Sequence, residues 1–130
     1  MIERTIKDNV LSLLGSKKAI IIIGARQVGK STLLQQMLSN RQDVMWLNGD
    51  DYDIQELFAS MTSTRIRTIL GNKKILVLDE AQRIEDVGIR LKLIIDQVPD
   101  VQVIATGSSS FELTAKVNET GRGYVYVATE

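Results

Sequence analysis

Residues 19–32 read Ala19-Ile20-Ile21-Ile22-Ile23-Gly24-Ala25-Arg26-Gln27-Val28-Gly29-Lys30-Ser31-Thr32, and this stretch decides the fold of the chain. It opens with a continuous apolar run rich in β-branched residues, which is typical of a strand buried on both faces of a parallel sheet. The eight residues from Gly24 to Ser31 then fit the GxxxxGK[ST] pattern at every fixed position. A helix is predicted from about Lys30 to Leu38. We therefore expect a strand, a phosphate-binding loop and a helix in direct succession.

This loop has the chemistry that a nucleotide phosphate requires. Glycines allow a tight turn and a close approach of backbone N–H groups to phosphate oxygens, and the following helix directs its positive end at the same anion. Lys30 is expected to neutralise the β- and γ-phosphates, and Ser31 to offer its hydroxyl to Mg²⁺. The alternative is a glycine-rich turn that matches by accident, which the position directly after a buried strand disfavours. The predicted nucleotide-binding residues are Gly24, Ala25, Arg26, Gln27, Val28, Gly29, Lys30, Ser31 and Thr32. Arg26 and Gln27 have a second interpretation, as surface residues or contacts to a neighbouring subunit.

The remaining sequence alternates between helical and strand patterns. Helices are predicted over 1–15, 54–61, 66–70, 87–98 and 109–117, and strands over 44–47, 75–78, 101–105 and 124–127. Strands that alternate with helices predict right-handed crossovers and a mainly parallel sheet. The predicted fold class is α/β, a three-layer P-loop NTPase sandwich of about five strands in one domain, residues 1–130. Trp46, Phe58 and Phe111 are expected to pack in its core.

Two carboxylates follow the third predicted strand. In an open α/β sheet, ligands bind at the carboxyl ends of the strands, so Asp79 and Glu80 are expected beside the phosphate loop. Asp79 can hold Mg²⁺ through its water shell, and Glu80 can polarise the water that attacks the γ-phosphate. The alternative, a solvated strand end, is disfavoured because a phosphate loop lies upstream. The Asn-Lys-x-Asp motif that reads guanine is missing, and Glu80 favours ATP hydrolysis over a GTPase or a small kinase.

Other polar residues are weaker candidates. Thr106 and Ser108 close the fourth predicted strand, where a hydroxyl could contact the γ-phosphate or orient water, or belong to a Gly-Ser turn. Arg122, between two glycines, could act as an arginine finger in cis or in trans, or be a plain surface residue. Three aspartates after the second strand have two interpretations, as nucleotide contacts or as a solvated loop and helix cap; they are Asp50, Asp51 and Asp53.

Composition excludes several kinds of chemistry. The 130 residues contain neither cysteine nor histidine, which rules out thiolate or imidazole metal ligands, disulfides and histidine bases. Sixteen basic and sixteen acidic residues balance, so nothing in the net charge supports a nucleic-acid or membrane partner. The charged N-terminus does not look like a secretory signal, and no apolar run approaches the roughly 20 residues that span a bilayer. We expect a cytoplasmic location.

Five segments together resemble AAA domain family 14, the prokaryotic ATPases of the AAA superfamily. The segments are Gly24–Ser31, Leu47–Asp51, Leu78–Gln82, Ala105–Ser110 and Gly121-Arg122. The resemblance implies binding of ATP and Mg²⁺ and hydrolysis of ATP, with Lys30, Ser31, Asp79 and Glu80 in the roles given above and Thr106 as a sensor. Family members usually continue into a C-terminal domain of uncharacterised function, so this chain is expected to be truncated.

Two functions from different classes remain open at this point. The first is an ATPase whose hydrolysis cycle drives a conformational change, with a homo-oligomer or a partner protein supplying an arginine. The second is a nucleotide-binding interaction module that holds ATP and hydrolyses it negligibly on its own. Phosphate release by this chain distinguishes them.

Overall fold

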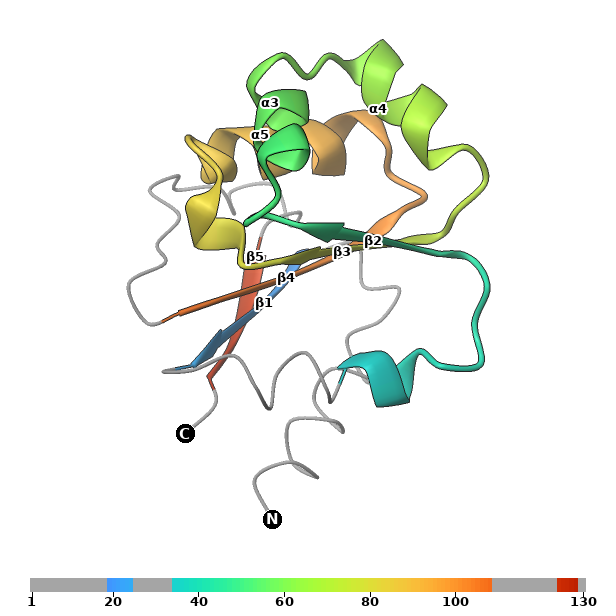
Figure 1. The fold of residues 1–130 in the computed structure, drawn as a ribbon. Coiled ribbons are helices and arrows are strands. Elements are labelled where there is room, and N and C mark those ends of the chain that lie inside the picture. The colour runs from blue at the N-terminus through green and yellow to red at the C-terminus, as the bar shows by residue number, and fades with distance from the viewer. Residues whose placement is uncertain (1–18, 25–33, 109–123, 129–130) are drawn as a thin grey trace.

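A computed structural model of the chain describes residues 19–24, 34–108 and 124–128, and its centre is a five-stranded parallel sheet (Figure 1). The strands are β1 Ala19–Gly24, β2 Val44–Asn48, β3 Ile75–Asp79, β4 Gln102–Ser108 and β5 Tyr124–Ala128. Their order in the sheet is β2-β3-β4-β1-β5, and every pair of neighbours is parallel. The predicted α/β class with a mainly parallel sheet is confirmed.

Helices lie on both faces of this sheet (Figure 1). Three of them share one face, α3 Tyr52–Ala59, α4 Ser63–Leu70 and α5 Val87–Gln97. Residues 34–37 are helical on the opposite face and belong to the helix predicted after the phosphate loop. A short 3₁₀ helix, η1 Ala81–Arg83, directly follows β3. Asp51 and Thr62 cap α3 and α4 by accepting hydrogen bonds from backbone N–H groups in the first turns.

Alternating side chains of the strands divide the core into two clusters. On the face of α3, α4 and α5, the buried strand residues include Ile21, Leu76, Leu78, Val103 and Ala105. On the other face, they are Ile20, Ile22, Val44, Ile75, Val77 and Ile104, which pack with Leu34 and Leu38. Because side chains alternate along a strand, Asp79 continues the row of Ile75 and Val77, and Thr106 continues that of Ile104. Both polar residues therefore belong to the face on which the helix after the phosphate loop packs.

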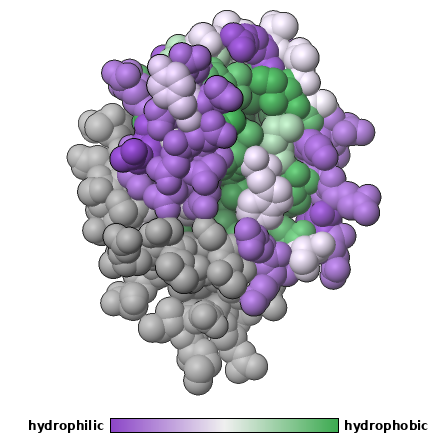
Figure 2. Space-filling model, in the orientation of Figure 1, coloured by the Kyte–Doolittle hydropathy of each residue, from purple (hydrophilic) through white to green (hydrophobic). Residues whose placement is uncertain are grey.

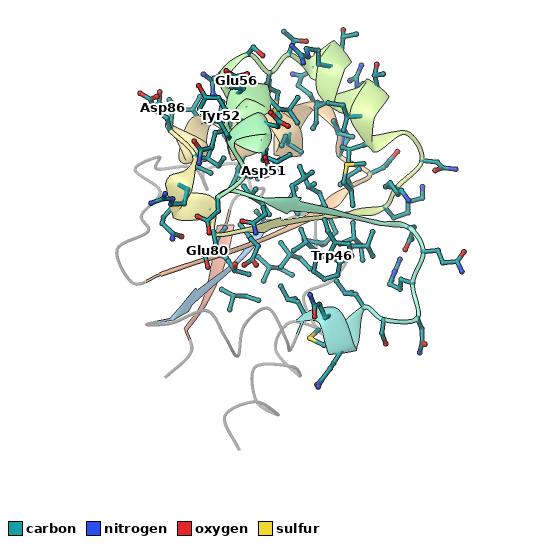
Figure 3. All side chains as sticks on the ribbon, viewed as in Figure 1. Trp46, Asp51, Tyr52, Glu56, Glu80 and Asp86 are labelled. Carbon is teal, nitrogen blue, oxygen red and sulfur yellow. The ribbon has the colours of Figure 1, made fainter. Side chains whose placement is uncertain are left out.

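The aromatic residues divide between core and surface. Phe58 is fully buried, as predicted, whereas the prediction that Trp46 packs in the core is wrong, because its side chain is 44% exposed. Trp46 lies on β2, which is at the edge of the sheet formed by the described strands (Figure 3). The predicted helices 1–15 and 109–117, together with Phe111, lie outside the described residues. Within the described ranges, no helix has the length and apolar character that a membrane crossing requires.

Candidate functional site

The carboxyl ends of β1, β2, β3 and β4 meet at one edge of the sheet. In the register of the strands, Gly24 lies opposite Ser108, Asn48 opposite Asp79, and Leu78 opposite Ala105. One step beyond that last pair, Asp79 reaches Thr106. The last residue of the strand that leads into the phosphate-loop motif thus lies on the same edge as the two acidic candidates, and this edge is where open α/β sheets bind ligands.

Strand order determines how these candidates are spaced. β4 is hydrogen-bonded to both β1 and β3, so it separates the strand of the phosphate loop from the strand of the acidic pair. With about 4.8 Å between neighbouring strands, β1 and β3 lie about 10 Å apart. Thr106 stands on the intervening strand, where it lies opposite Ile22 of β1 and contacts Asp79 of β3.

A hydrogen-bond network joins Thr106 to both acidic residues. Thr106 is fully buried, and its hydroxyl donates to Asp79 Oδ1. The same hydroxyl oxygen accepts the backbone N–H of Glu80, with 3.3 Å between N and Oγ1. That N–H also donates to Asp79 Oδ1 at 3.1 Å. The network fixes the Asp79 carboxylate and the start of the segment after β3 in one arrangement.

The backbone of Glu80 has a strained conformation. Its φ and ψ angles are 52° and 48°, in the left-handed region that non-glycine residues rarely adopt. Such a residue costs about 1–3 kcal/mol and persists only when its surroundings hold it in place. Here Thr106 and Asp79 hold its N–H, and its carbonyl oxygen accepts the N–H of Arg83 at 3.1 Å. The strain therefore marks Glu80 as a residue whose position is strongly determined.

The side chain of Glu80 is also held. Gln82 Nε2 donates to Glu80 Oε1 at 2.8 Å, and both side chains are half-buried. Arg83, the next residue, is directed elsewhere: its Nε lies 3.1 Å from Asp50 Oδ1 in an exposed ion pair. In Figure 3, Glu80 lies at the end of β3, apart from the acidic residues on α3. The carboxylate thus contacts a neutral donor and no cation among the described residues.

Gly49 is a site residue that the sequence prediction missed. Its N–H donates to Asp79 O at 2.7 Å, and a Cβ at this position would lie 2.2 Å from the carbonyl oxygen of Glu80. Gln55 on α3 donates through Nε2 to Gly49 O at 2.8 Å. Only glycine permits this approach of β2 to the residues after β3. The available signal was a glycine directly after a predicted strand, but its partner is 31 residues away and could not be inferred locally.

Two of the three aspartates after β2 have structural roles. Asp51 caps α3, since its Oδ1 accepts the N–H of Asp53 at 2.9 Å, so the helix-cap interpretation is confirmed for Asp51. Asp50 forms the ion pair with Arg83. The side chains are exposed, and hydrophilic residues gather over α3 and the start of α5 in Figure 2. An exposed pair of this kind contributes little to stability because water screens it.

One carboxyl group outside this edge has a shifted pKa. A side-chain hydrogen bond from Arg41 lowers the pKa of Asp43 below its ordinary value, and the charge of Arg41 acts in the same direction. Arg41 Nη2 lies 2.7 Å from Asp43 Oδ2. Asp43 directly precedes β2, at the amino end of the strand, so this pair is at the opposite edge of the sheet from Asp79.

Several predicted site residues lie outside the described ranges. Among the nucleotide-binding candidates, Gly24 is described and ends β1 at the expected edge. The undescribed candidates are Ala25, Arg26, Gln27, Val28, Gly29, Lys30, Ser31, Thr32 and Arg122. Asp79, Glu80 and Thr106 are brought together as described above. Ser108 is the last residue of β4, as expected for a residue that closes this strand, and the alternative of a Gly-Ser turn does not apply to it.

Comparison with known proteins identifies the family and the fold. The family model described as AAA domain matches residues 16–129, and no curated protein matches the chain. A chain in the structure of Drosophila ORC bound to AT-rich DNA and Cdc6 is similar with a TM-score of 0.66 and 13% identity, over 97% of this chain and 53% of that chain. A chain of Drosophila ORC bound to DNA has a TM-score of 0.64 and 13% identity, over 98% of this chain and 90% of that chain. For C. elegans PCH-2 the TM-score is 0.53 with 17% identity, over 98% of this chain and 39% of that chain.

The family match and the structural matches support different conclusions. The family match extends over most of the chain, whereas the structural matches share too little sequence to show more than a common fold. The chain spans about half the length of the first ORC chain. Both Drosophila structures contain DNA, which is a property of those complexes.

Proposed function

The chain belongs to the AAA domain family, and from that premise we propose that it binds ATP with Mg²⁺ and hydrolyses ATP to ADP and phosphate. The observation that carries this proposal is the network of Thr106, Asp79 and Glu80. It lies on the sheet edge at which Gly24 begins the phosphate-loop motif. A fixed carboxylate pair beside such a motif is what cation binding and water activation require.

The donor set suits Mg²⁺. This cation takes oxygen ligands, keeps several of its waters and is usually held by one or two carboxylates together with substrate phosphates. Asp79 supplies a half-buried carboxylate that is already oriented by Thr106, and Ser31 is proposed to add its hydroxyl. When bound, Mg²⁺ would neutralise part of the negative charge of the β- and γ-phosphates. Lys30 is proposed to bind the same phosphates directly, since a lysine acts there as a mobile point charge.

Glu80 is proposed as the group that accepts a proton from the attacking water. A general base must lie within hydrogen-bond reach of the water and keep its orientation. The strained and hydrogen-bonded backbone of Glu80 supports that role, because strain of this kind is found at functional sites. Thr106 is proposed to sense the γ-phosphate through its contact with both carboxylate residues. Arg122 is proposed as an arginine that stabilises charge in the transition state, within the chain or in a neighbouring copy.

The cellular role is proposed at a coarser level. Hydrolysis in such a domain is proposed to drive a conformational change in a partner protein or a second copy of the chain, in the cytoplasm. The segment after β3 is suited to report the nucleotide state, because it contacts both the end of β4 and the loop after β2.

Nucleotide binding is tested first with Lys30→Ala. We expect this variant to lose detectable binding of a slowly hydrolysed ATP analogue with Mg²⁺, measured by calorimetric titration, because it removes a charge placed against the phosphates. Lys92→Ala is the matched control, since Lys92 pairs with Asp96 on α5, away from the sheet edge. Equal binding by wild type and a folded Lys30→Ala protein would show that the phosphate-loop assignment is wrong.

Hydrolysis is tested with Glu80→Gln. This change keeps the size of the side chain and removes the basic carboxylate, so affinity for ATP should persist while turnover falls about 100-fold to 10,000-fold. Phosphate release measures turnover, and Glu56→Gln, an exposed glutamate on α3, serves as the control. A wild type that binds ATP and releases no phosphate would contradict the ATPase proposal and leave the nucleotide-binding module.

A further inference from the structure

We propose that Gln82 is a positioning residue for ATP hydrolysis, which orients the Glu80 carboxylate toward the attacking water; this inference rests on the proposed ATPase function. Gln82 lies in η1, two residues after Glu80, and its Nε2 donates to Glu80 Oε1 at 2.8 Å. Neither side chain is fully exposed. The contact is therefore a specific, partly shielded hydrogen bond to the carboxylate on which hydrolysis depends.

The other contacts of Glu80 among the described residues involve its backbone, so the orientation of its side chain depends on Gln82. Thr106, Asp79 and Arg83 hold the N–H and carbonyl of Glu80, and the close approach of Gly49 limits its backbone further. These contacts fix the position of the Cα atom of Glu80, but they do not restrict the χ angles of its side chain. Gln82 contacts Oε1, and Oε2 has no hydrogen bond among the described residues. One carboxylate oxygen is thus anchored, and in the proposed geometry the attacking water contacts the other.

The chemical type of the donor suits a base. A glutamine amide is neutral, so it orients the carboxylate through a hydrogen bond without forming an ion pair. A cation is close in the sequence, but Arg83 is directed to Asp50 and not to Glu80. The structure therefore joins a neutral donor to the base and turns the neighbouring positive charge away from it.

A kinetic double-mutant cycle tests whether Gln82 acts through Glu80. Gln82→Ala in otherwise wild-type protein should lower kcat about 10-fold to 100-fold, the effect of losing one hydrogen bond to a charged group, with KM and ATP affinity nearly unchanged. In the Glu80→Gln background, the same change should lower the rate little further, because the group it orients no longer acts as a base. Single-turnover assays with enzyme in excess keep the slow rates measurable. Gln97→Ala, an exposed glutamine at the end of α5, is the matched control and should leave both backgrounds unchanged.

A second measurement is independent of activity. In ¹H–¹⁵N spectra of the chain, the Gln82 side-chain amide is assigned as the signal lost in Gln82→Ala. We expect this signal to move toward that of exposed Gln97 when Glu80→Ala removes the carboxylate. An unmoved signal would show that the contact is absent in solution and would overturn the proposal.

The outcomes separate this inference from the proposed function. If wild type hydrolyses ATP and Gln82→Ala does so at the same rate, or loses the same factor in both backgrounds, Gln82 has at most a structural role and the ATPase proposal stands. If wild type releases no phosphate, the ATPase proposal fails and the positioning role fails with it, even where the amide signal responds to Glu80→Ala. The positioning role of Gln82 is supported if Gln82→Ala lowers kcat only in protein that retains Glu80, and if the amide signal of Gln82 moves in Glu80→Ala.

Discussion

At the scale of single residues, Thr106 shows how one hydroxyl connects two strands and a loop. It is buried, it donates to Asp79, and it accepts from the N–H of Glu80. A buried hydroxyl with both a donor and an acceptor partner avoids the cost of an unsatisfied polar group. The same two contacts hold the Asp79 carboxylate and the backbone N–H of Glu80, so a change at Thr106 is expected to affect both stability and the proposed turnover.

Thr106→Val keeps the shape of the side chain and removes the hydroxyl. We expect the free energy of unfolding to fall by about 1–3 kcal/mol, since the half-buried Asp79 carboxylate loses one of its hydrogen-bond donors and the Glu80 N–H loses one of its acceptors, and turnover to fall as well. Urea denaturation and phosphate release measure the two effects. Thr64→Val, on the exposed side of α4, should change the free energy of unfolding by no more than about 0.5 kcal/mol. Similar losses in both variants would argue against a special role for the Thr106 hydroxyl.

At the scale of elements, the junctions after β2 and β3 behave as one unit. Gly49 donates to Asp79 O, packs against the carbonyl of Glu80, and is itself held by Gln55 of α3. Asp50 is joined to Arg83 of η1. We therefore expect a displacement of the loop after β2 to change the backbone of Glu80.

Gly49→Ala tests this coupling. The added Cβ would meet Glu80 O at 2.2 Å, so the two segments must separate. We expect a loss of about 1–3 kcal/mol in the free energy of unfolding, together with reduced turnover. Gly71→Ala is the comparison, because Gly71 has a φ of 58° and open space where its Cβ would lie. It should lose about 1–2 kcal/mol through backbone strain alone and keep its turnover. Equal turnover in both variants would show that Gly49 does not influence Glu80.

At the scale of the whole molecule, both faces of the sheet support the candidate site. The apolar rows of β3 and β4 that lead to Asp79 and Thr106 pack with Leu34 and Leu38 of the helix predicted after the phosphate loop. The other face packs with α3, α4 and α5. A ligand bound at the carboxyl edge would hold together strands and helices that are far apart in the sequence, so binding is expected to stabilise the entire fold.

Thermal unfolding measures this linkage. At an ATP concentration about 100-fold above the dissociation constant, Mg²⁺ and ATP should add about 2.7 kcal/mol to the free energy of unfolding and raise Tm by about 10 °C. ATP with a chelator should raise Tm less, because Ser31 and Asp79 are proposed to act through the metal. Lys30→Ala should show no shift under either condition. Equal shifts with and without chelator would mean that neither residue serves the cation.

Much of the fold was predictable from local sequence patterns. A continuous β-branched run predicted the first strand as buried, short apolar segments predicted the strands at 44–47, 75–78 and 101–105, and a weaker pattern predicted the fifth at 124–127, where β5 Tyr124–Ala128 lies. Alternation with helices predicted the parallel sheet. The phosphate-loop motif and the Asp79-Glu80 pair were recognisable because each depends on residues that are consecutive in the chain and follow a strand directly. Chain connectivity and side-chain period are sufficient for predictions of this kind.

What the sequence by itself determined is therefore the set of elements and the chemical groups at their ends. Tertiary structure alone decided that β4 lies between β1 and β3, which brings Thr106 to Asp79, and that Gly49 meets Glu80 across 31 residues. It also decided that Trp46, on an edge strand, is exposed. The physical reason is that strand order and close backbone approach arise from pairing between distant segments, whereas periodicity and motifs report only on neighbours along the chain.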